Sequence, residues 1–99
     1  MTGRAYRLTE RAEQDIIEIY LEGLSRFGEQ QADRYHQELT SLFELIALNP
    51  KMARERLELA PPVRIHPHKA HLIVYLEESD GILIVRVRHG HEDWDQAPV

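Results

Sequence analysis

The stretch His71-Leu72-Ile73-Val74-Tyr75-Leu76-Glu77-Glu78-Ser79-Asp80-Gly81-Ile82-Leu83-Ile84-Val85-Arg86-Val87-Arg88-His89 decides the fold. Two apolar runs rich in β-branched residues, 71–77 and 82–89, lie on either side of an Asp-Gly turn. An Asp-Gly pair between such runs is a strong hairpin signal. A shorter run at 63–66 precedes them across the segment 67–70. The sequence therefore predicts three strands in an antiparallel meander.

Alternation along the last of these strands assigns its side chains to two faces. The face expected to contact the rest of the core carries Leu83, Val85, Val87 and His89. The opposite face carries Ile82, Ile84, Arg86 and Arg88. Because this second face changes from isoleucine to arginine along the strand, we expect it to be at least partly open to water or to a partner.

The first half of the chain has the periodicity of two helices. Thr9 is a good N-cap for a helix that begins near Glu10, and Gly28 supplies a stop before a second helix over 29–48. Asn49-Pro50 ends that helix. Apolar stripes, including the aromatic residues that we assign to the core, are formed by Ala12, Ile16, Ile19, Tyr20, Gly23 and Phe27, and by Ala32, Tyr35, Leu39, Leu42, Phe43 and Ile46. The carboxylates expected on a solvated face of the first helix are Glu10, Glu13, Asp15, Glu18 and Glu22.

These elements predict one α+β domain over residues 1–99. A short N-terminal strand near residues 6–8 is followed by a two-helix antiparallel hairpin, which packs on a small antiparallel sheet. Residues 50–62, with three prolines, are expected to form a loop that crosses from the helices to the sheet. A chain of this size buries roughly two thirds of its unfolded surface, which suits a single core.

Composition excludes several classes of function. The formal net charge of −5 has the wrong sign for a protein that binds phosphate backbones, so we expect no direct binding of nucleic acid. The absence of cysteine excludes disulfides and thiolate metal sites. No apolar run is long enough for a membrane span or a signal peptide, so we expect a soluble, cytoplasmic protein with no membrane partner.

Five short motifs occur in an informative order. They are Arg26-Phe27-Gly28-Glu29-Gln30-Gln31-Ala32 before Tyr35, Asn49-Pro50 before Arg54 and Arg56, Glu58-Leu59-Ala60-Pro61-Pro62-Val63-Arg64, His71-Leu72-Ile73-Val74-Tyr75, and Val85-Arg86-Val87-Arg88-His89-Gly90. Over nearly its whole length the chain resembles the ParE toxins of the RelE/ParE superfamily, which are also called plasmid stabilisation proteins. Ala53, Leu76 and Arg88 depart from the usual pattern, and these departures affect the target rather than the fold.

The resemblance implies the toxin of a type II toxin–antitoxin system. Such a toxin is held inactive by a ParD-like antitoxin in a hetero-oligomer, and is generally described as a DNA gyrase inhibitor rather than an enzyme. One alternative is a RelE-like ribosome-dependent mRNA endonuclease, in which Arg64, Lys69, Arg86 and Arg88 would form a phosphate-binding patch. A tyrosine near the C-terminus, common in such sites, is missing after Tyr75. A second alternative is a degenerate, non-toxic binding module.

Two pairs of histidines raise the possibility of a metal site. His66 and His68 stand two residues apart, as do His89 and His91, with Glu92 and Asp93 close behind. Pro67 interrupts the first pair and Gly90 is expected to end the strand within the second. The serines lack a glycine elbow or an evident paired base. We therefore expect no metal site, no cofactor and no catalytic residue.

The function is expected to depend on two interaction surfaces. Ile17, Leu21 and Leu24 form a second apolar face of the first helix and are the candidate antitoxin-binding residues, unless the crossing loop buries them. The candidate target-binding residues are at the C-terminal strand and tail, namely Arg86, Arg88, His91, Asp93 and Trp94. These charged and aromatic side chains lie at the end of the sheet or after it and have no evident role in packing the core.

Overall fold

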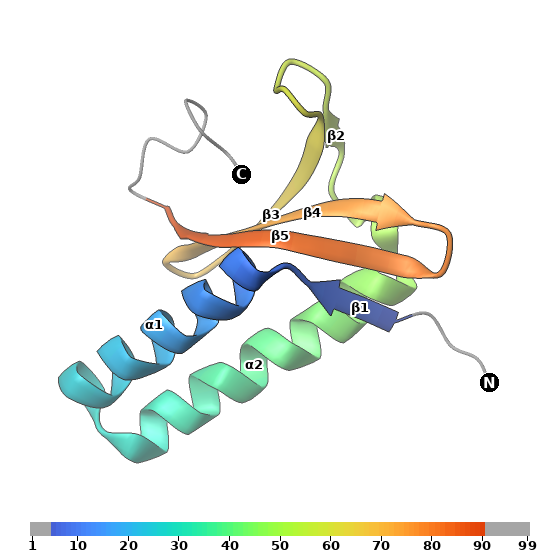
Figure 1. Ribbon diagram of the computed structural model, residues 1–99. Coiled ribbons are helices and arrows are strands. Elements are labelled where there is room, and N and C mark those ends of the chain that lie inside the picture. The colour runs from blue at the N-terminus through green and yellow to red at the C-terminus, as the bar shows by residue number, and fades with distance from the viewer. Residues whose placement is uncertain (1–4, 91–99) are drawn as a thin grey trace.

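The computed structural model describes residues 5–90, which form two layers. A two-helix hairpin covers one face of a five-stranded sheet with strand order β1-β5-β4-β3-β2 (Figure 1). The elements are β1 (Ala5–Leu8), α1 (Glu10–Phe27), α2 (Glu29–Leu48), the 3-10 helix η1 (Pro50–Met52), β2 (Glu55–Arg56), β3 (Val63–His68), β4 (His71–Glu78) and β5 (Gly81–His89). This arrangement confirms the predicted α+β fold.

Local signals place both helices where the sequence predicted them. The Thr9 hydroxyl accepts a hydrogen bond from the backbone N–H of Ala12 at 3.0 Å and so caps α1. Gly28, with φ of 90°, turns the chain between the helices, and its N–H donates to the carbonyl of Leu24. Asn49 ends α2 before Pro50. The turn of this hairpin lies away from the sheet (Figure 1), and Phe27, which we had assigned to the core, is 59% exposed there.

The sheet contains the predicted meander and one parallel pair besides. β3, β4 and β5 pair antiparallel in sequence order, with a tight turn at Lys69-Ala70 and another at Ser79-Asp80. β1 pairs parallel with β5 from Ala5↔Gly81 to Leu8↔Ile84. Residues 50–62 were expected to be a loop, but they contain η1 and the short strand β2, which pairs with β3.

A β-bulge in β5 reverses the predicted faces of part of that strand. Tyr75 pairs with Ile84 but its neighbour Val74 pairs with Arg86, so Val85 is the additional residue. Ile82 and Ile84 therefore pack into the core against the helices, together with Val87 beyond the bulge. Val85 packs on the far face, in contact with a second cluster of Leu59, Val63 and Val74. The prediction for Val87 was right, and those for Ile82, Ile84 and Val85 were wrong because strict alternation cannot include a bulge.

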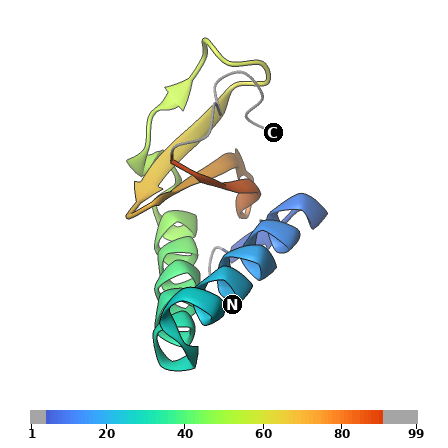
Figure 2. The same ribbon diagram turned by 90° about the vertical axis from the view of Figure 1, so that its left-hand side faces the viewer.

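The two apolar clusters lie on opposite faces of the sheet. The larger joins the inner faces of α1 and α2 to the sheet and includes the fully buried Phe43, Ile46 and Tyr75. The smaller lies where the segment that contains β2 folds over the other face (Figure 2). Neither helix of the described chain is long and apolar enough to cross a membrane.

Candidate functional site

The outer face of α1 exposes two large aliphatic side chains. Ile17 is 51% and Leu21 is 56% exposed, and Leu24 is partly exposed. The opposite side of α1 carries Ala12 and Ile16, which are buried in the main core. The crossing segment packs elsewhere, with Ala53 in the main core and Leu59 on the far face of the sheet. The alternative that it buries Ile17 and Leu21 is therefore wrong.

Carboxylates surround this exposed face. Glu10, Glu13 and Glu18 are all exposed, as predicted, and Gln14 donates a hydrogen bond to Glu18 at 3.3 Å. Between residues 5 and 90, no cation lies within ion-pair distance of these three carboxylates. Glu22, farther along the helix, pairs with Arg26 at 3.1 Å.

Asp15 is the exception among the acidic residues of α1, and it corrects two predictions. Its side chain is buried, with the residue 8% exposed. Its Oδ2 accepts from Arg86 Nε at 2.7 Å and from the backbone N–H of Val87 at 2.9 Å, and its Oδ1 accepts from Arg86 Nη2 at 3.0 Å. Asp15 is therefore not on the solvated face, and the Arg86 side chain is only 13% exposed.

The position of β1 explains this pair. β1 ends at Leu8, opposite Ile84, so the outer edge of β5 has no strand partner beyond that point. The Thr9 hydroxyl donates to the carbonyl of Val85 at 2.9 Å, and Asp15 accepts from the N–H of Val87. Because a buried backbone N–H must find an acceptor, the first turns of α1 replace the missing strand along this part of β5.

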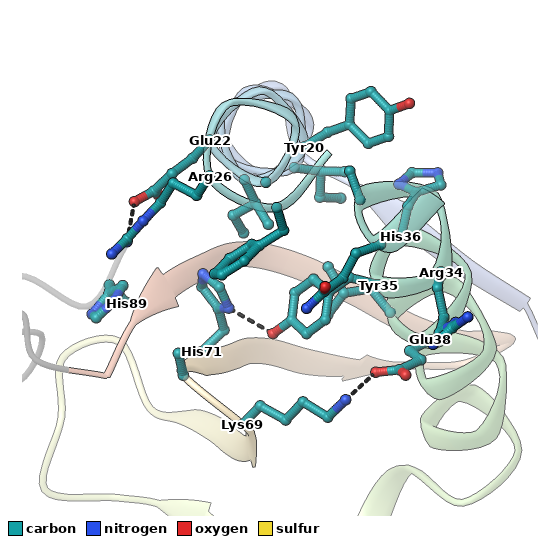
Figure 3. Close-up of a pocket in the computed structure, with 18 residues that line it drawn as sticks. Tyr20, Glu22, Arg26, Arg34, Tyr35, His36, Glu38, Lys69, His71 and His89 are labelled. Carbon is teal, nitrogen blue, oxygen red and sulfur yellow. Dashed lines mark hydrogen bonds and ion pairs between the residues drawn. The ribbon is translucent and has the colours of Figure 1, made fainter. Parts of the chain in front are cut away.

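A pocket of about 400 Å³ opens between the helices and the ends of the strands (Figure 3). Its apolar lining includes Ile19 and Phe27, and its polar lining includes Tyr35, His71 and His89. Tyr35 Oη lies 2.7 Å from His71 Nδ1, and the rings of His71 and His89 are 5.5 Å apart, edge to face. The sequence analysis assigned Tyr35 to the core and did not predict this pocket. The sequence pattern that could have indicated this pocket is the occurrence of polar aromatic residues on an apolar helix stripe and at strand ends.

Burial and charge set the protonation of this pocket. Burial, and then the nearby Glu38, raise the pKa of Tyr35 to about 12. Lys69, which donates to Glu38 at 2.7 Å, lowers the pKa of that carboxyl. Tyr35 therefore keeps its proton near neutral pH. The hydrogen bond between its hydroxyl and His71 Nδ1 joins α2 to β4 on the pocket wall.

The basic residues of the ribonuclease alternative have separate partners. Arg64 donates to the carbonyl of Ala53 at 2.7 Å, Lys69 pairs with Glu38, and Arg86 pairs with Asp15. Arg88 lies opposite Leu72 in the β4–β5 register. Three of the four cations are thus held by partners in three different parts of the chain.

The histidine pairs can be placed only in part. His66 and His68 both belong to β3, which continues through Pro67, so the predicted interruption is wrong. His68 Nε2 lies 3.4 Å from Glu38 Oε1. Within the described part of the chain, no three His, Asp or Glu side chains are placed to hold a metal ion. The predicted residues His91, Asp93 and Trp94, and Glu92 between them, lie outside the described residues.

Comparisons with known proteins agree on one family. A family model described as the ParE toxin of a type II toxin–antitoxin system, parDE, matches residues 6–94. The chain is 31% identical over 86 residues to the Toxin ParE1 of Caulobacter vibrioides, covering 87% of this chain and 88% of that protein. It is 30% identical over 92 residues to the Toxin ParE1 of Mycobacterium tuberculosis, covering 92% and 94%. The solved structure of a chromosomal ParDE system from P. aeruginosa shares the fold, with a TM-score of 0.74 at 17% identity over 87% of this chain and 95% of that one.

Proposed function

We infer that this chain, which belongs to the ParE toxin family of type II toxin–antitoxin systems, is neutralised by a ParD-like antitoxin that covers the outer face of α1. In this proposal Ile17, Leu21 and Leu24 are the residues that the antitoxin binds. The toxin and its antitoxin then form a hetero-oligomer in the cytoplasm. The released toxin acts on DNA gyrase through the end of β5 and the residues that follow it.

The observation that carries the proposal is the exposure of Ile17 and Leu21, each by more than half, on a helix whose opposite side buries Ala12 and Ile16 in the main core. Completing the burial of such a side chain contributes on the order of 1 kcal/mol. Ile17, Leu21 and Leu24 stand at intervals of four and three residues, so they line up along one side of α1. A segment that is disordered alone can gain order by laying an apolar face on such a stripe.

The target surface is assigned to the end of β5 and the following segment. Arg88, His91, Asp93 and Trp94 remain the proposed target-binding residues. Arg86 acts indirectly, because its pair with Asp15 fixes the edge of β5 on α1. Arg88 follows two residues later on the strand that is fixed in this way. We assign the direct contact with gyrase to Arg88 and the residues after it.

We also propose that the toxin acts by binding rather than as an enzyme. Cleavage of RNA would require several cations that converge on one phosphate. Arg64, Lys69 and Arg86 instead bind Ala53, Glu38 and Asp15, which lie in separate parts of the chain. This arrangement supports a target-binding mechanism over the ribonuclease mechanism.

The test is a pair of assays on one preparation of purified toxin, each run with and without the protein encoded by the neighbouring reading frame. We expect inhibited DNA supercoiling with accumulated linear DNA, intact mRNA in a ribosome-dependent cleavage assay, and relief by the neighbouring protein. Cut mRNA with normal supercoiling would assign the chain to the ribonuclease mechanism. No effect in either assay would contradict gyrase as the target.

A further inference from the structure

The helical layer of this protein carries a strong negative charge, which the sheet does not share. α1 and α2 together hold nine carboxylates and three arginines. Residues 49–90, by contrast, hold seven lysines and arginines and five carboxylates. The surface that the proposed function assigns to the antitoxin therefore lies on the acidic layer.

The acidity extends to the immediate surroundings of the exposed apolar residues. On a helix, residues three, four or seven apart lie on the same side. Glu13 is four residues before Ile17, Glu10 is seven before it, and Glu18 is three before Leu21. Two of the remaining carboxylates of α1 are neutralised, because Asp15 pairs with Arg86 and Glu22 with Arg26. Within α1 itself, Arg11 is the one arginine in the N-terminal half of the helix, where the three carboxylates Glu10, Glu13 and Glu18 outnumber it.

We propose that the segment covering this face is a basic amphipathic helix, whose apolar residues contact Ile17 and Leu21 and whose flanking lysines or arginines pair with Glu10, Glu13 and Glu18. This inference rests on the proposed function and specifies the chemistry of the antitoxin segment. A helical occupant fits because the spacing of Ile17, Leu21 and Leu24 forms a ridge that packs into the groove of another helix. The stripe spans about 10 Å, so two or three turns of the partner cover it.

The same charges exclude other occupants. An acidic segment would place like charges next to Glu13 and Glu18, and such juxtaposition is a common means of rejecting wrong partners. An anionic lipid surface attracts basic helices and repels this one. The phosphates of nucleic acid are repelled for the same reason. The exposed apolar face is therefore specific for a protein segment of positive charge.

The test uses the purified antitoxin, the protein encoded by the reading frame beside the toxin gene. Its affinity for three toxin variants is measured at 50 mM and 500 mM salt. Glu13→Gln/Glu18→Gln removes two charges beside the stripe. Glu29→Gln/Glu44→Gln is the matched control, because it removes two exposed charges from α2, one of them also in the first turn of its helix. Ile17→Gln/Leu21→Gln removes the apolar contact and keeps the charge.

We expect the Glu13→Gln/Glu18→Gln variant to weaken binding about 2- to 30-fold at low salt, which corresponds to two exposed ion pairs. The difference should shrink at high salt because the ions screen it, and the control should bind as the parent does. Unchanged or tighter binding by this variant, or equal losses in variant and control, would overturn the inference. If Ile17→Gln/Leu21→Gln binds as the parent does, the proposed surface itself is wrong. Binding of the toxin to phosphatidylserine vesicles would contradict the exclusion of lipid.

Discussion

Asp15 on α1 and Arg86 on β5 form a buried two-point ion pair across a sequence separation of 71 residues, with N–O distances of 2.7 and 3.0 Å. The same carboxylate accepts the N–H of Val87. The pair therefore connects the start of the helical hairpin to the end of the sheet that leads into the proposed target surface. Its loss should affect the stability of the fold and the placement of that surface together.

We predict that Asp15→Ala lowers the free energy of unfolding by roughly 3 to 5 kcal/mol, because it leaves a buried guanidinium and a backbone N–H without their acceptor. Urea denaturation measures this loss. Glu78→Gln is the control, since the Arg7–Glu78 pair is exposed, and it should change stability little. Equal effects of the two substitutions would contradict a structural role for the Asp15–Arg86 pair.

Gly81→Ala should disrupt the parallel pairing of β1 with β5. Gly81 has φ of 152°, and a Cβ there would lie 1.7 Å from the carbonyl oxygen of Ala5. The cost is on the order of 2 kcal/mol or more, because backbone must move. Hydrogen exchange of the β1 amides should accelerate.

Gly23→Ala is the control, because it should change the stability of the fold in the opposite direction. Gly23 lies within α1, where an added Cβ would meet Ala32 Cβ at 3.4 Å. Alanine in a helix interior is favoured over glycine by about 0.5 to 1 kcal/mol, so we expect a modest gain in stability. A gain for both glycine substitutions would show that β1 does not depend on Gly81.

Alkaline pH should reveal the buried hydroxyl of Tyr35. Its pKa is raised from the ordinary value of 10.0 to about 12 in the folded chain. The folded state thus holds this proton more tightly, so its contribution to stability is complete below pH 10 and is lost as the pH rises toward 12. The absorbance of tyrosinate, as the difference between the parent and Tyr35→Phe, should titrate near pH 12. A midpoint near 10 would mean that Tyr35 is not buried in this way.

The sequence predicted what depends on neighbouring residues. Thr9, Gly28 and Asn49-Pro50 place the ends of the helices through local hydrogen bonds and backbone preferences, and all three predictions were confirmed. The exposed stripe at Ile17 and Leu21 was also predictable, because the main apolar stripe of α1 leaves these residues out.

Features that depend on distant partners were missed. Asp15 has the same local pattern as the solvated Glu13, and it becomes a buried acceptor because of its distant partners on β5, the guanidinium of Arg86 and the backbone N–H of Val87. The bulge at Val85 arises from the pairing of β5 with β4, which the sequence of β5 alone does not reveal. Strict alternation therefore assigned Ile82 and Ile84 to the wrong face. Phe27 follows the apolar stripe of α1, but the hairpin turn extends beyond the sheet and leaves its ring exposed. In each case tertiary geometry overrides a correct local pattern.

Neutralisation and toxicity should be separable by substitution, because the two proposed surfaces lie on different elements. Ile17→Gln/Leu21→Gln changes only the exposed side of α1, so the toxin should fold and inhibit growth, but co-expression of the antitoxin should no longer restore it. Deletion of residues 91–99, or Arg88→Ala, should have the opposite effect, with growth inhibition lost and antitoxin binding kept. Growth curves with and without the antitoxin, together with pull-down of each variant, measure both properties. A truncated toxin that stays folded and still stops growth would place the target surface elsewhere.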